Sequence, residues 1–122
     1  MHVIICTDNQ GVIEAVGRSI AGEAGRVSAC ESGMELLAAV RALAADLVVL
    51  DLDTPGMNGL LLVSAVQQLQ PKLPIVAVSG RAMDVRPLLQ RGVRYVALNG
   101  DLLQPLVTEV ARQAAAAGAP AR

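Results

Sequence analysis

Five short apolar runs, each followed by a longer stretch with helical spacing, constrain the fold of this chain more than any other feature. The runs cover residues 3–6, 26–30, 47–50, 75–78 and 95–98. Runs this short suit buried strands, whereas the stretches between them carry apolar residues at the three- and four-residue spacing of a helix face. Strict alternation of strands and helices predicts a parallel sheet with right-handed crossovers and helices on both faces.

The composition agrees with a sheet that is buried on both sides. Hydrophobic residues make up 53% of the 122 residues, yet Trp and Phe are absent and Tyr95 is the only aromatic residue. The core must therefore consist of aliphatic side chains, which is typical of strands covered on both faces. The length fits one domain, which we expect over residues 1–117, with a flexible tail at 118–122.

Local signals refine the expected helices. Ser32 with Glu35 three residues later has the spacing of a capping box and predicts a helix start. Asp84 can cap a short helix that tolerates Pro87 in its first turn and ends at Gly92. The pair at 99–100, Asn-Gly, predicts a tight turn before a last helix at about 102–116.

Charge and hydropathy exclude several partners. The net charge is -1 and no basic run is present, so we expect no direct contact with nucleic acid. The apolar runs are far shorter than the ~20 residues of a membrane span, and no signal-peptide pattern opens the chain. We therefore expect a cytoplasmic protein with no membrane contact.

The sequence also disfavours a transition-metal site and a nucleotide site. Cys6 and Cys30 form no CxxC motif, and His2 is the single histidine, so both cysteines are expected to be buried, reduced thiols. No GxGxxG or Walker-type loop occurs, which argues against a small enzyme or nucleotide binder with this fold.

Polar residues follow the predicted strands at the edge where open parallel sheets form their sites. Asp8 follows the first strand, Asp51 and Asp53 the third, and Ser79 the fourth. Taken singly, each has an ordinary structural interpretation; Asp8, for example, could cap the first helix. Together they predict a crevice in which repelling carboxylates favour a divalent cation such as Mg2+ and in which Asp51 could act as a nucleophile toward a phosphoryl donor.

The segment 46–59, Asp-Leu-Val-Val-Leu-Asp-Leu-Asp-Thr-Pro-Gly-Met-Asn-Gly, resembles the receiver domain of bacterial response regulators. The resemblance extends from residue 1 to about 116. It implies a flavodoxin-like (βα)5 three-layer sandwich with strand order 2-1-3-4-5. It also implies that Asp51 accepts a phosphoryl group from a histidine kinase or phosphotransfer protein, so that the domain is a signalling module rather than an enzyme.

The resemblance carries further residue roles. Asp8, Asp51 and the backbone carbonyl of Asp53 would bind a weakly held Mg2+, and Ser79 would hydrogen-bond the phosphoryl group and act as a switch. Tyr95 would be the aromatic switch residue. The face formed by the fourth helix, fifth strand and fifth helix would contact an effector domain or a second copy of the chain.

Two departures from the family pattern leave an alternative open. Thr7 stands where the family has a first acid, and Leu98-Asn99 stands where it has a Lys-Pro pair; the only lysine, Lys72, lies at the opposite edge of the sheet. We hypothesise that Arg81 contacts the phosphoryl group instead. The alternative is a pseudo-receiver, a protein-interaction module that works without phosphorylation.

Overall fold

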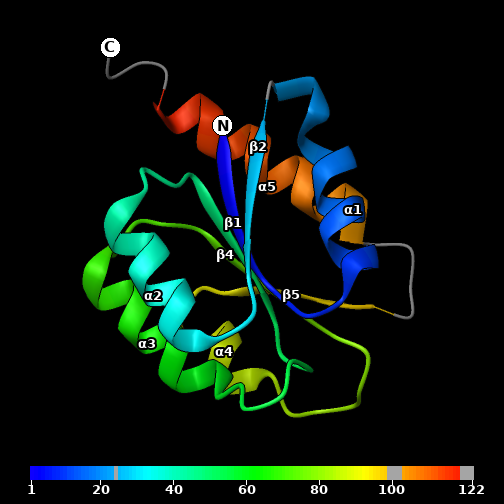
Figure 1. Cartoon of the computed structure of the whole chain (residues 1–122), viewed down its shortest axis with the longest axis vertical. Coiled ribbons are helices and arrows are strands. Elements are labelled where there is room, and N and C mark those ends of the chain that lie inside the picture. Colours follow the sequence, from blue (N-terminus) through cyan, green and yellow to red (C-terminus); the bar gives the residue numbers. More distant parts are fainter. Residues whose placement is uncertain (24, 99–102, 119–122) are drawn as a thin grey trace.

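The structure, a computed structural model, describes residues 1–23, 25–98 and 103–118 (Figure 1). Its strands form one parallel sheet in the order β2-β1-β3-β4-β5. The strands are β1 (His2–Cys6), β2 (Arg26–Cys30), β3 (Leu47–Asp51), β4 (Ile75–Ser79) and β5 (Arg94–Ala97). The helices are α1 (Gln10–Ile20), α2 (Gly33–Ala42), α3 (Gly59–Leu69), α4 (Arg86–Leu89) and α5 (Leu103–Gly118), and a 3-10 turn, Ala21–Glu23, follows α1. This confirms the expected fold class and strand order.

Helices cover both faces of the sheet, which gives three layers (Figure 1). One face packs against α1 and α5 through a cluster that includes Val16, Val49 and Val107. The other packs against α2, α3 and α4 through a cluster that includes Leu36, Leu50 and Val63. The central strands β1, β3 and β4 are buried along their whole length, because both their faces are covered. The aliphatic composition of these strands is what the double burial requires.

Side-chain caps fix where the helices begin. Ser32 Oγ accepts a hydrogen bond from the Glu35 N–H at 3.1 Å and caps α2, as predicted. Asn9, not Asp8, caps α1, since Asn9 Oδ1 accepts from the Gly11 N–H at 2.9 Å. The interpretation of Asp8 as a helix cap is therefore wrong, and Asp8 is left exposed beside the carboxyl edge of the sheet.

The second half of the chain differs from expectation in detail. Helix α4 spans only Arg86–Leu89, with Val85 at the N-cap position and no side-chain cap, although Asp84 Oδ1 does accept from the Arg86 N–H at 3.1 Å. Helix α5 continues through Gly118, one residue into the expected tail. The predicted Asn99-Gly100 turn and residues 119–122 lie outside the described residues.

The two cysteines are buried neighbours. Cys6 and Cys30 are register partners at the ends of β1 and β2, and both are free. The neighbouring Cys30 and burial raise the pKa of the Cys6 thiol, which therefore stays protonated at neutral pH. Among the helices of the described residues, none is long and apolar enough to cross a membrane.

Candidate functional site

Asp51 lies at the carboxyl end of the central strand β3 and is only 2% exposed. Its two carboxylate oxygens have different donors. Oδ1 accepts from the Asp53 N–H at 2.9 Å, and Oδ2 accepts from the Thr7 hydroxyl at 2.6 Å. Thr7 Oγ1 in turn accepts from the Asn9 N–H at 3.0 Å, which fixes the direction of its proton. The carboxylate is therefore held in one orientation at the edge of the sheet.

Thr7 is a functional residue that the sequence analysis missed. The sequence analysis noted only that Thr7 stands where the family has an acid. In the structure, Thr7 is 1% exposed and its hydroxyl donates to Asp51. One signal was available, because a hydroxyl that directly follows a strand can reach the residue that ends the adjacent strand, and β1 pairs with β3. A buried carboxylate needs hydrogen-bond donors, and Thr7 supplies one without adding charge.

The Asp53 carboxylate faces the loop after β4. Its Oδ1 accepts from the Ser79 hydroxyl at 2.8 Å and from Arg81 Nε at 2.9 Å, and its Oδ2 accepts from the Gly80 N–H. Arg81 Nη2 also donates to the Leu52 carbonyl at 3.4 Å. Three consecutive residues, 79–81, thus direct their donors at one carboxylate. The sequence analysis expected the Asp53 backbone carbonyl to bind Mg2+, but it did not predict that the Asp53 carboxylate accepts hydrogen bonds from residues 79–81.

These donors lower the pKa of the Asp53 carboxyl below its usual range. The Gly80 N–H has the largest effect, and Arg81 and Ser79 add to it against the opposing effect of burial. A carboxyl with a lowered pKa in the folded state stabilises the fold at all pH values above its ordinary pKa. That contribution is lost only as the pH falls through the lowered value, so the contacts are intact at neutral pH.

Ser79 ends β4, as predicted, whereas β5 ends at Ala97, one residue before its predicted end at Leu98. Ser79 is fully buried, and its Oγ also accepts from the Arg81 N–H at 3.0 Å. The Leu98 N–H donates to the Ser79 carbonyl at 2.8 Å, so the residue just after β5 still pairs with β4 beside the site. The side chain at that position is apolar. Tyr95 is half-buried and pairs with Ala77 of β4. Because Ala77 lies two residues before Ser79, the side chains of Tyr95 and Ser79 are on the same face of the sheet.

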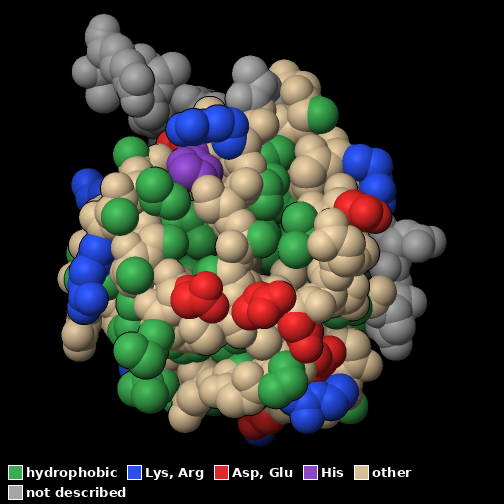
Figure 2. All heavy atoms as spheres, viewed as in Figure 1, with side chains coloured by type: hydrophobic (Ala, Val, Ile, Leu, Met, Phe, Trp, Pro, Cys, Tyr) green, Lys and Arg blue, Asp and Glu red, His purple; other side chains and the backbone are tan. Residues whose placement is uncertain are grey.

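Acidic side chains visible in Figure 2 gather mostly in the lower half of that view, toward the carboxyl ends of the strands in Figure 1. Within the described residues, however, no three Asp, Glu, His or Cys side chains are grouped closely enough to hold a metal ion by themselves. Asp8 is exposed, Asp51 is buried, and the Asp53 carboxylate is held by residues 79–81. Any divalent ion here would depend on few protein carboxylates.

Thr54, in the loop after Asp53, carries a buried hydroxyl for which the described part of the chain shows no hydrogen-bond partner. Because an unsatisfied buried polar group costs about 1–3 kcal/mol, we expect Thr54→Val to raise the free energy of unfolding by about 1 kcal/mol. Urea unfolding of both proteins measures the difference. A loss of stability in Thr54→Val would show that the hydroxyl has a partner.

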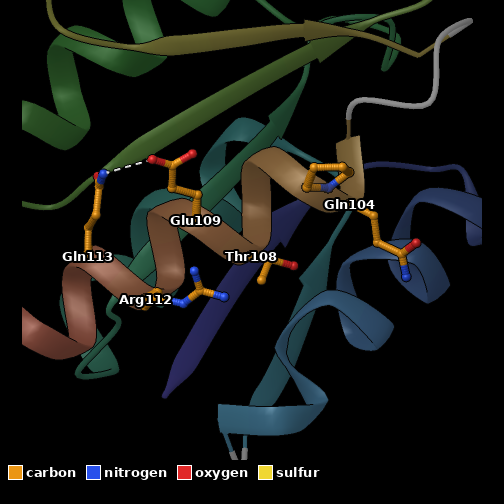
Figure 3. A pocket seen from close by; sticks show the side chains of 6 residues that line it. Gln104, Thr108, Glu109, Arg112 and Gln113 are labelled. Atoms are coloured by element: carbon orange, nitrogen blue, oxygen red, sulfur yellow. Dashed lines mark hydrogen bonds between the residues drawn. The ribbon is translucent and has the colours of Figure 1, made fainter.

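A surface hollow lies along α5, and Figure 3 shows side chains that line it. Its lining residues in the described part of the chain all belong to α5, where Gln113 Nε2 donates to Glu109 Oε1 at 3.3 Å. The lining residues are Gln104, Pro105, Thr108, Glu109, Arg112 and Gln113. Since all of them come from one helix surface, the hollow adds no group to the crevice around Asp51.

Comparison with known proteins places the chain in a family. The family model for the response regulator receiver domain matches residues 3–97. The transcriptional regulatory protein GlrR of Escherichia coli is 30% identical over 94 residues, which cover 75% of this chain and 21% of GlrR. The chain thus spans about a fifth of the length of this relative.

Solved structures show the same fold. The CheY-like receiver domain protein from Methanospirillum hungatei is similar at a TM-score of 0.79, with 19% identity and 94% of each chain covered. The phosphorylated cyanobacterial phytochrome response regulator RcpA is similar at a TM-score of 0.75, with 19% identity over 96% of this chain and 95% of RcpA. With the family match over most of the chain, these similarities show that the chain belongs to the response regulator receiver domain family.

Proposed function

We propose that this domain accepts a phosphoryl group on Asp51 from a histidine kinase or a phosphotransfer protein. The observation that carries the proposal is the Asp51 carboxylate itself, held at the carboxyl edge of the sheet by Thr7 and the Asp53 N–H. A carboxylate oxygen attacks phosphorus, the bond from phosphorus to the donor's nitrogen breaks, and an aspartyl phosphate forms. Phosphorylation of the similar protein RcpA agrees with this assignment.

The residues around Asp51 fit the Mg2+ ion that receiver domains use. Magnesium is commonly held by one or two carboxylates, with water and phosphate oxygens completing its shell. Asp8, Asp51 and the backbone carbonyl of Asp53 would hold it, and it would neutralise charge on the transferring phosphoryl group. Because Thr7 provides no second acid beside Asp8, we expect weaker Mg2+ binding than in receivers that have one.

Intact mass after incubation with acetyl phosphate and Mg2+ tests the proposal. We expect the wild-type protein to gain one phosphoryl group and Asp51→Ala to gain none, because no other carboxylate among the residues that the structure describes is buried at this edge. Asp84→Asn, an acid-to-amide change in an exposed residue of the loop after β4, serves as a control and should be labelled like the wild type. Absence of label in the wild type at any Mg2+ concentration would refute the proposal.

The second candidate is a pseudo-receiver that binds partners without phosphorylation. The observation that favours it is Leu98, because an apolar side chain cannot supply the positive charge that a lysine would bring to a phosphoryl group. Its interaction surface would include Tyr95, which lines a small hollow between β5 and α5 with Pro105 and Leu106. In that case a partner would bind wild type and Asp51→Ala equally.

A further inference from the structure

The donors around Asp53 lie next to the proposed acceptor, because Asp51 pairs with Val78, the residue that precedes Ser79 in β4. The Ser79 hydroxyl, the Gly80 N–H and the Arg81 guanidinium come from three consecutive residues beside the acceptor, and the Asp53 carboxylate takes all of them. We propose that Asp53 is an internal anionic ligand of this donor set, which must be displaced before a phosphoryl group on Asp51 can bind the same donors. The displacement of Asp53 rests on the proposed phosphorylation of Asp51. The binding of the Asp53 carboxylate to residues 79–81 does not depend on it.

Burial shows which of these contacts matters most. Ser79 is fully buried, and its hydroxyl has two acceptors within reach, Asp53 Oδ1 at 2.8 Å and the Arg81 carbonyl at 3.1 Å, of which the charged carboxylate is the nearer. The side chains of Arg81 and Asp53 are 67% and 27% exposed, and an ion pair that is open to solvent contributes little. The contact of Asp53 with Ser79 is therefore the most sheltered of the three, and the contacts with Gly80 and Arg81, both at exposed residues, supplement it.

Gly80 leaves the space that its contact with Asp53 needs. A Cβ atom at this position would lie 3.2 Å from Asp53 Oδ2, tighter than about nine in ten Cβ contacts, so the carboxylate would have to move by a few tenths of an ångström. The absence of a side chain at residue 80 is thus what lets the carboxylate approach the backbone N–H.

The arrangement has a consequence for signalling. With Asp53 as ligand, the Ser79 loop is already drawn toward the mouth of the site in the unphosphorylated protein. A phosphoryl group on Asp51 would take the place of the Asp53 carboxylate as the acceptor for Ser79, Gly80 and Arg81. Asp53 thus slows the uptake of the phosphoryl group and reduces the movement of Ser79 that uptake can cause.

Asp53→Asn tests the proposal because it keeps the shape of the side chain but removes its charge. We expect faster amide hydrogen exchange at Gly80 in the variant, whether or not Asp51 is phosphorylated. We also expect labelling by acetyl phosphate and Mg2+ to be about tenfold faster, since charge-assisted hydrogen bonds no longer have to be broken. The control Asp84→Asn should leave both rates unchanged, and Asp53→Ala is the second variant if Asp53→Asn does not fold.

Each outcome decides part of the proposal. Unchanged exchange at Gly80 in both Asp53 variants would overturn the internal ligand. Equal labelling rates in wild type and Asp53→Asn, with exchange increased, would overturn the competition alone. If no protein is labelled, the proposed function and the competition fail together, while increased exchange at Gly80 would still establish Asp53 as the ligand of the loop.

Discussion

Replacing Thr7 with aspartate is expected to make the stability of this domain depend on Mg2+. The new carboxylate would lie at a position that is 1% exposed, where Thr7 Oγ1 now donates to Asp51 at 2.6 Å. Two carboxylates would then face one another without a proton or cation between them. By analogy with other uncompensated buried charges, we expect the free energy of unfolding in EDTA to fall by about 3 kcal/mol.

Magnesium should restore much of that loss, because an ion that binds only the folded state stabilises it in proportion to its occupancy. Lower pH should also help, since the pair of like charges raises the pKa of one carboxyl and folding then takes up a proton. Urea unfolding in EDTA and across a series of Mg2+ concentrations measures both effects. The same variant should be labelled by acetyl phosphate at lower Mg2+ concentrations than the wild type.

Thr7→Val is the matched control for Thr7→Asp. It keeps the branched shape of threonine but removes the hydroxyl, so Asp51 loses one donor and no charge is added. We expect a loss of about 1–3 kcal/mol, the cost of a buried acceptor without its partner, and no added response to Mg2+. Equal stability of Thr7→Asp with and without Mg2+ would show that the site does not take the ion through this position.

The fold could be predicted closely from the sequence because its signals are local. Four- and five-residue apolar runs marked the strands, and the structure extends most of them by only one residue at an end. The Ser32 cap of α2 was equally readable, since both partners lie within four residues. Helix α4 was harder, because a segment with Pro87 in its first turn and Gly92 at φ +83° has few residues left for regular helix.

The candidate site was predictable in position but not in its contacts. That Asp51, Asp53 and Ser79 share one edge follows from the parallel sheet. Which donor each carboxylate takes does not, because Thr7 and Asp51 are 44 residues apart in sequence and Ser79 and Asp53 are 26 apart. Such pairings depend on strand register and on side-chain rotamers, which no local pattern specifies. For the same reason, the hypothesis that Arg81 contacts a phosphoryl group remains a prediction, and in the structure its partner is Asp53.

Leu36→Ala is expected to cause a large loss of stability. Leu36 is fully buried on α2 and packs in the cluster between the sheet and helices α2, α3 and α4, which contains no Phe or Trp to fill a gap. Truncation of a buried leucine leaves a cavity and costs about 2–5 kcal/mol. Met34→Ala, on the same helix at a side chain that is 84% exposed, should change the free energy of unfolding by less than about 0.5 kcal/mol.

Urea unfolding of the two variants measures this difference directly. Leu36 takes no part in the contacts of Asp51 with Thr7 or of Asp53 with Ser79. Leu36→Ala should therefore still be labelled on Asp51 under conditions in which it remains folded, so that loss of stability and loss of the site are separated. A loss below about 1 kcal/mol would mean that the cluster closes around the truncated side chain. Such closure would require α2 to shift against β1 and α3, the two elements that it contacts most.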